Sequence, residues 1–115
     1  MGKTEQQQIT LDTSSEEVVI NYGDLRKAVL ILRAINHKLR QSIIKMLEEN
    51  NRMTVTDIYI KLRLEQSVAS QHLAILRRAG VVSTERIGKF IHYYLNQTRL
   101  TEINGLIEEL ASEIK

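Results

Sequence analysis

The hydrophobic pattern of this chain changes its period at Gly80, and that change constrains the fold more than any other feature of the sequence. Before Gly80 the apolar residues recur with helical spacing. After it, Val81 to Ile87 and Phe90 to Leu95 follow a period of two, with Gly88-Lys89 between them. Both runs are rich in β-branched and aromatic residues, which predicts a β-hairpin. A helical pattern returns from Arg99 to Ile114, so we expect a mainly α-helical fold with one small β-hairpin.

Four helices are predicted before Gly80, and capping residues mark most of their ends. The first is apolar on all sides, which predicts that one side faces the core and the other a second subunit. The predicted helices are Leu25–Ile35 with Asp24 as N-cap after a break at Gly23, Asn36 or His37 to Asn50-Asn51, Thr54–Leu62 with Thr54 and Asp57 as its caps, and Gln66–Ala79 with Gly80 as its stop.

Residues 1–22 are expected to lie outside this helical domain. Residues 1–14 are rich in Gln, Thr and Ser, which predicts a flexible tail. Ser14 and Glu17 have capping-box spacing ahead of Val18-Val19-Ile20, which favours a short helix or an extended arm. We therefore expect a polar tail or short extra helix over 1–22 and a single domain over 23–115.

The composition excludes several classes of function. The chain has no cysteine, so it forms no disulfide, thiolate metal site or thiol nucleophile. No apolar run approaches the roughly 20 residues of a membrane span, and the N-terminus lacks the apolar stretch of a signal peptide. There is also no glycine-rich phosphate loop and no recognisable nucleophile–histidine motif. We expect a cytoplasmic protein that is not an enzyme, binds no cofactor and contacts no membrane.

The net charge of +2 conceals an uneven distribution of charge along the chain. Residues 1–22 carry a net −3 and residues 96–115 a net −2, whereas residues 23–53 carry +4 and residues 54–95 carry +3. A basic centre between acidic ends indicates an anionic partner, of which nucleic acid is the commonest.

The third and fourth predicted helices are joined by a tight connection, which predicts a helix-turn-helix, and the hairpin after them supplies a wing. A helical wheel places Ala69, His72, Leu73 and Leu76 on one side of the fourth helix. On the other side, amides and hydroxyls can bind base edges, small side chains permit close approach to the major groove, and arginines reach phosphates. That side carries Gln66, Ser67, Ser70, Gln71, Ala74, Arg77 and Arg78.

The stretch QSVASQHL from Gln66 to Leu73, followed by LRRAGVV from Leu76 to Val82, resembles the recognition helix and exit of the ArsR/SmtB winged-helix repressors. The resemblance covers about residues 25–114. It implies a winged helix-turn-helix homodimer, formed by the first and last helices, that binds a roughly palindromic operator in double-stranded DNA. It also implies repression of transcription that a signal releases. The other matching residues are Arg40, Ile43 and Leu47 in the second helix and Gly88-Lys89, Tyr93 and Leu95 in the wing.

The resemblance also implies roles for individual residues. The positions that read the groove would be Gln66, Ser67, Ser70 and Gln71. The contacts with phosphates, and those of the wing with the backbone or minor groove, would be Thr54, Thr56, Arg77, Arg78, Arg86 and Lys89. The excess apolar surface of the first and last helices independently favours a dimer. Its interface would comprise Val29, Leu32, Leu100, Ile103, Leu106, Ile107 and Leu110.

The chain departs from the family where its members sense metals. Thr54 to Leu62 contains no cysteine, and Arg99 to Lys115 contains no histidine or aspartate. His37-Lys38 replaces the Asp-Pro that typically starts the second helix, and Glu65 adds a negative charge where Ser or Thr is usual. No two of the three histidines have the spacing of a ligand pair, and His72 is expected to be a satisfied core residue. No metal site is predicted within one protomer, while a site shared across a dimer stays open.

Two alternatives for function stay open. The same fold can bind RNA or bridge proteins without operator specificity. A DNA-binding dimer can also respond to an apolar small molecule or to a partner protein, with Tyr22, Tyr59 and the first helix lining a pocket, although core packing is the favoured use of those residues.

Overall fold

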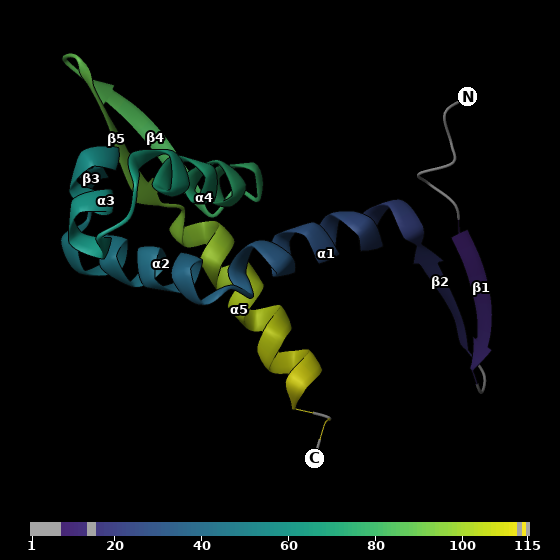
Figure 1. The fold of residues 1–115 in the computed structure, drawn as a ribbon. Coiled ribbons are helices and arrows are strands. Elements are labelled where there is room, and N and C mark those ends of the chain that lie inside the picture. Colours follow the sequence, from purple (N-terminus) through teal and green to yellow (C-terminus); the bar gives the residue numbers. More distant parts are fainter. Residues whose placement is uncertain (1–7, 14–15, 113, 115) are drawn as a thin grey trace, which may run out of the picture. The chain divides into compact units, whose positions relative to one another are not determined.

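The computed structural model describes residues 8–13, 16–112 and 114 of the chain (Figure 1). These residues form two compact units, 1–33 and 34–115. The structure is mainly helical with an antiparallel hairpin near its end, as predicted. The element order differs from the prediction, because three strands (β1, β2 and β3) lie where none was expected. The elements are β1 (Gln8–Thr13), β2 (Glu16–Asn21), α1 (Tyr22–Ile35), α2 (Lys38–Asn50), β3 (Met53–Thr54), α3 (Val55–Leu62), α4 (Gln66–Arg78), β4 (Val82–Ile87), β5 (Phe90–Leu95) and α5 (Gln97–Ala111).

The first unit contains an antiparallel hairpin that sequence reasoning missed. β1 pairs with β2 in a register that runs from Gln8 opposite Asn21 to Thr13 opposite Glu16. Of the two alternatives before residue 22, the short helix is therefore wrong and the extended arm is confirmed at Glu16–Asn21, although its pairing with β1 was not predicted. The physical reason lies in Val18-Val19-Ile20, three β-branched residues that favour extended backbone over helix. Ser14, the predicted cap of that helix, lies outside the described residues.

Helix α1 begins earlier than predicted. The backbone N–H of Asp24 donates to Oδ1 of Asn21 at 3.0 Å, so the capping side chain belongs to Asn21 and not to Asp24. Gly23 lies inside the first turn instead of breaking the helical pattern. The Asn21 cap satisfies an N–H group at the helix end, which allows the helix to begin ahead of Gly23.

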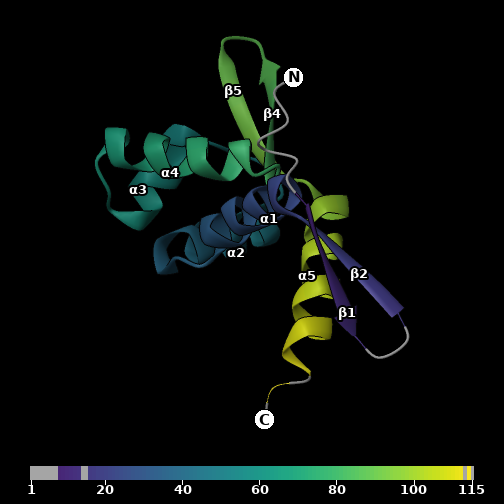
Figure 2. The same cartoon turned by 90° about the vertical axis from the view of Figure 1, so that its right-hand side faces the viewer.

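The second unit contains the predicted helix-turn-helix. Helix α3 packs against α4, α2 packs on α4 and on β5, and the three-stranded sheet has the order β3-β5-β4. Local caps explain the helix starts: His37 Nδ1 accepts from the N–H of Leu39 at 3.1 Å, and Thr54 and Asp57 form a capping box at α3. These starts, and the end of α2 at Asn50, confirm the predicted boundaries. In two views at right angles, hairpin β4–β5 projects beyond α3 and α4 (Figures 1 and 2).

The core of the second unit lies between α2, α3, α4 and the sheet. Helix α5 begins at Gln97, two residues before the predicted start, because the Asn96 side chain accepts from the N–H of Arg99 at 3.2 Å and caps it. Among the described residues, no helix combines the length and apolar character that crossing a lipid bilayer requires. The largest fully buried side chains are Ile43, Leu47, Ile58, Leu73, Leu76, Val81 and Val82.

Candidate nucleic-acid interface

Helix α4 has one buried and one exposed side, as the helical wheel predicted. Ala69, Leu73 and Leu76 are buried in the core. The exposed side bears amides and hydroxyls in its first half and guanidinium groups in its last turn, and the helix contains no acidic residue. Its exposed residues include Gln66, Ser67, Ser70, Gln71, Ala74, Arg77 and Arg78. The predicted groove-reading residues therefore share one accessible surface.

A Schellman motif ends α4 and leads directly into β4. The N–H of Gly80 donates to the carbonyl of Arg77, and the N–H of Val81 donates to the carbonyl of Leu76, each at 3.0 Å. Gly80 has φ +77°, which L side chains rarely adopt, and a Cβ built on it would lie 3.1 Å from Nε of Arg99. Gly80 therefore sets the short path from the exposed helix to the wing.

A depression of about 430 Å³ joins α4 to the wing. Ser70, Ala74, Arg77 and Arg78 of α4 line it together with Tyr93 of β5. Two guanidinium groups beside hydroxyl donors are suited to a phosphate. Sequence reasoning assigned no DNA contact to Tyr93. Its signals in the sequence are its position on a period-two strand and its match to the family's wing, and neither tells which part of α4 the residue faces.

The base of the wing is held by a side chain that sequence reasoning also missed. Arg52 Nη1 donates to Glu85 Oε1 in a short ion pair, and the Arg52 guanidinium lies over the ring of Tyr94, 4.6 Å from its centroid. Next to Glu85, at the turn of the hairpin, Nε of Arg86 donates to the carbonyl of Gly88 at 3.1 Å. Arg86 and Lys89 are both exposed near the tip. The wing is therefore anchored at its base and cationic at its tip.

The capping box predicted at the N-terminus of α3 occupies the helix end where phosphate contacts were also expected. The N–H of Asp57 donates to Oγ1 of Thr54, and the N–H of Thr54 donates to Oδ2 of Asp57, both at 3.2 Å. The Asp57 carboxylate thus takes the place at the helix end that a phosphate would need. Thr54 is half-buried, whereas Thr56 is exposed. Of these two predicted phosphate contacts, Thr56 is the more accessible.

Three side chains from the start of α2 and from α4 lie close together. Arg40 Nε donates to the carbonyl of Ala34 at 2.6 Å, and its Nη1 donates to Nδ1 of His72 at 3.2 Å. The rings of His37 and His72 lie 5.0 Å apart between centroids. Desolvation by burial lowers the pKa of His72, and the positive charges of His37 and Arg40 lower it further. His72 is hydrogen-bonded, as expected, but it is half-buried and does not belong to the fully buried core.

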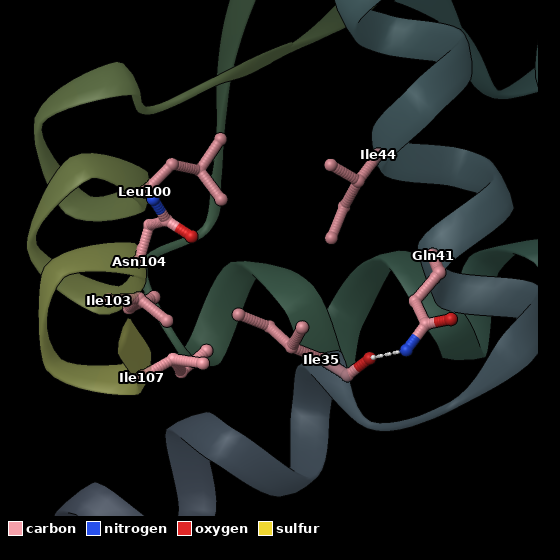
Figure 3. Close-up of a pocket in the computed structure, with 7 residues that line it drawn as sticks. All are labelled: Ile35, Gln41, Ile44, Leu100, Ile103, Asn104 and Ile107. Atoms are coloured by element: carbon pink, nitrogen blue, oxygen red, sulfur yellow. Dashed lines mark hydrogen bonds between the residues drawn. The ribbon is translucent and has the colours of Figure 1, made fainter. Parts of the chain in front are cut away.

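The predicted dimer residues divide into buried and accessible ones. Ile103 is only 7% exposed and belongs to the core of its own unit, whereas Leu106, Ile107 and Leu110 are 40–59% exposed. On α1, Val29 is exposed and Leu32 is half-buried; Leu100 on α5 is also half-buried. An apolar pocket of about 200 Å³ lies beside Ile103 (Figure 3). It is lined by Ile35, Gln41, Ile44, Leu100, Ile103, Asn104 and Ile107.

Among the described residues, no group of three or more His, Cys, Asp or Glu side chains is placed to hold a metal ion. His37 and His72 do lie together in space, 35 positions apart in the chain, although sequence spacing gave no hint of it. A guanidinium hydrogen-bonded to one of the two rings disfavours a cation at that point.

Comparison with known proteins agrees with the geometry. The model of the bacterial regulatory proteins of the arsR family matches residues 37–84. The HTH-type transcriptional regulator MJ1325 of Methanocaldococcus jannaschii is 38% identical over 73% of this chain and 94% of its own length. The transcriptional repressor SdpR of Bacillus subtilis is 36% identical over 67% of this chain and 86% of its own.

The transcriptional activator HlyU of Vibrio cholerae is 39% identical over 73% of this chain and 74% of its own. Its solved structure aligns with a TM-score of 0.59 at 36% identity, covering 79% of this chain and 95% of HlyU. This chain therefore belongs to the arsR family of bacterial regulatory proteins.

Proposed function

We propose that this protein is a transcriptional regulator that binds double-stranded DNA as a homodimer, with α4 reading the major groove. The observation that carries the proposal is the exposed side of α4, which holds amides and hydroxyls, then arginines, and no acid. Base edges suit the first group and phosphates suit the second. Membership of the arsR family supports the same function.

The contacts divide by chemistry. Gln66, Ser67, Ser70 and Gln71 would bind base edges, because their donors and acceptors lie on the accessible side of α4. A phosphate would occupy the depression beside Tyr93, where it would receive hydrogen bonds from Arg77 and Arg78. Thr56, Arg86 and Lys89 would contact the backbone on either side of that helix.

The apolar surface of α5 supports a second copy of the chain as partner. Leu106, Ile107 and Leu110 leave a row of exposed apolar side chains, which is unfavourable in water unless it is covered. The neighbouring pocket, at about 200 Å³, falls below the 300–1,000 Å³ typical of ligand sites, so it fits side chains of a partner better than a separate ligand. Two-fold symmetry would then place two α4 helices about 34 Å apart along the DNA.

Repression is the simplest outcome, since a dimer bound at a promoter competes with polymerase. Named relatives include a repressor, SdpR, and an activator, HlyU, so the direction of regulation depends on where the operator lies. With no cysteine in these 115 residues, we propose that the releasing signal does not act through a thiol. A small molecule or a partner protein is the proposed kind of effector.

Selection of bound duplexes from a random pool tests the proposal directly. We expect an enriched palindrome with half-sites one helical turn apart, and the same sequence when the selection is repeated with divalent metals or a chelator. Failure to enrich any sequence would refute operator binding and would favour the protein-bridging or RNA-binding alternative.

Two variants then separate the proposed roles on the selected duplex. Gln71→Ala should lose about 1–3 kcal/mol of discrimination at one base position. Lys89→Ala should weaken binding to every duplex alike and reduce the salt slope by about one. Equal losses on selected and random duplexes for both variants would contradict this assignment.

A charge on α5 tests the dimer. Leu106→Glu should give a monomer in analytical ultracentrifugation, because a carboxylate would be buried without a partner. Thr101→Glu is the matched control, since it adds the same charge at an exposed polar position of the same helix and should leave the dimer intact. A dimer that survives Leu106→Glu would place the interface elsewhere.

A further inference from the structure

The tip of the wing exposes apolar side chains that nothing in the fold requires there. Ile87, Phe90 and Ile91 are 49%, 56% and 43% exposed. Ile87 is directly opposite Phe90 in the β4–β5 register, so their side chains share one face of the hairpin. Phe90 is also the single phenylalanine of the chain. A projecting apolar pair of this kind indicates a contact with another molecule.

The tip around this apolar pair is narrow and positively charged. The turn contains Gly88, and a Cβ added to this glycine would have no other atom within 4 Å, so the tip is narrow and open. Arg86 and Lys89 flank the apolar pair and are exposed. Glu85, which is the one acid among the described hairpin residues, lies two positions before Ile87 and is paired with Arg52. The tip therefore presents hydrocarbon between two cations, without a nearby unpaired carboxylate.

We propose that Ile87 and Phe90 form a wedge that enters the DNA minor groove, partly unstacks one base step and kinks the duplex. The inference rests on the proposed DNA-binding function and assigns the wing a second task besides phosphate contact. Apolar side chains inserted between base steps are how many minor-groove proteins bend DNA toward the major groove. The cations beside the wedge meet the negative potential of that groove.

DNA is favoured over a protein partner because the wing shares its surface with α4. Tyr93, on the strand that bears Phe90, lines the same depression as Ser70, Arg77 and Arg78. A duplex held by the exposed side of α4 would therefore reach β5 at Tyr93. Phe90 lies three positions before Tyr93, on the opposite face of β5, so the tip of the hairpin would extend past that contact into the adjacent groove. The complementary charges of Arg86 and Lys89 point to the same occupant.

The proposed wedge predicts a feature of the base sequence of the bound duplexes. Unstacking costs least at pyrimidine–purine steps such as TA and CA. The duplexes recovered by selection should therefore carry such a step at a fixed distance outside each half-site, at a position that α4 does not reach.

The test uses the selected duplex with 2-aminopurine at each flanking step in turn, and with donor and acceptor dyes at its two ends. The wild-type protein should raise the 2-aminopurine fluorescence at one step and shorten the end-to-end distance. Phe90→Ala should abolish both signals and weaken binding about tenfold, because burial of one aromatic ring contributes at least that much to affinity. Phe90→Leu, which keeps an apolar side chain able to insert, should retain both signals.

Other readouts separate the wedge from fold and charge. Phe90→Ala removes no charge, so its salt slope should equal that of the wild type, whereas Lys89→Ala should change the slope and keep the bend. An unchanged melting temperature of Phe90→Ala excludes a folding defect. If Phe90→Ala bends and unstacks the duplex as the wild type does, the inference is overturned and the tip is a protein contact. If the wild type selects no duplex at all, the proposed function fails, and the wedge fails with it.

Discussion

The substitution Gly80→Ala tests whether the turn between α4 and the wing is set by backbone conformation. Gly80 has φ +77°, and a new Cβ would lie 3.1 Å from Nε of Arg99. A left-handed conformation costs a non-glycine residue about 1–2 kcal/mol. The lower entropy of the unfolded chain with alanine returns about 0.4–1 kcal/mol of this.

The contact with Arg99 adds to that cost. Its guanidinium is the end of a flexible side chain that is 41% exposed, so it can shift at a cost of a few tenths of a kcal/mol. The sum predicts a loss of about 0.2–2 kcal/mol in the free energy of unfolding, with a midpoint of about 1 kcal/mol. For a domain of this size the midpoint corresponds to a melting temperature lower by roughly 4–8 °C.

Thermal unfolding followed by circular dichroism at one fixed protein concentration measures this loss. Gly105→Ala is the matched control of opposite sign: Gly105 lies within α5 at ordinary φ with open space around it, so alanine should stabilise by about 0.5–1 kcal/mol. Repeating Gly80→Ala in an Arg99→Ala background isolates the contact from the φ cost. A melting temperature of Gly80→Ala at or above that of the wild type would refute the reasoning.

Three further perturbations probe the same surface. Arg52→Ala removes both the Glu85 ion pair and the contact with Tyr94. The wing amides should therefore exchange hydrogen faster, while the melting temperature falls by only a few degrees, because exposed ion pairs contribute about 0–1 kcal/mol. Unaltered exchange in β4 would show that the wing is held by other contacts. Glu65→Ser should raise the free energy of unfolding by about 0.5–1 kcal/mol, because Glu65 makes no capping hydrogen bond at α4, and it should tighten DNA binding, because Glu65 carries a negative charge. Glu65→Gln is the control that removes only the charge. Weaker DNA binding by both variants would mean that the carboxylate does not face DNA. Burial, with His37 and Arg40, lowers the pKa of His72, so the unfolded chain binds more protons than the folded one below about pH 7, and the free energy of unfolding should fall as the pH drops through 6.5. Urea titrations of His72→Gln should lack that part of the pH dependence, and an identical slope in wild type and variant would assign it to other groups.

Elements whose ends depend on local chemistry could be predicted from the sequence. The capping box of Thr54 and Asp57 and the stop at Gly80 involve hydrogen bonds between residues within five positions of each other. The exposed and buried sides of α4 follow from one helical period, which is why the wheel predicted them correctly. The same reasoning could not decide between a helix and an extended arm at Glu16–Asn21, because a strand depends on its pairing with β1 and the local signal at Glu17 resembled a helix start.

The sequence by itself determined the order of the central helices and wing, the polarity of α4 and the absence of thiol chemistry, since each follows from residue type and short-range spacing. Only the tertiary structure decided which distant residues meet. Arg52 reaches Glu85 across 33 positions, Arg40 reaches His72 across 32, and Tyr93 joins α4 at one depression. Such contacts depend on how helices and strands pack against each other, and a periodic pattern specifies which face is buried but not what lies against it.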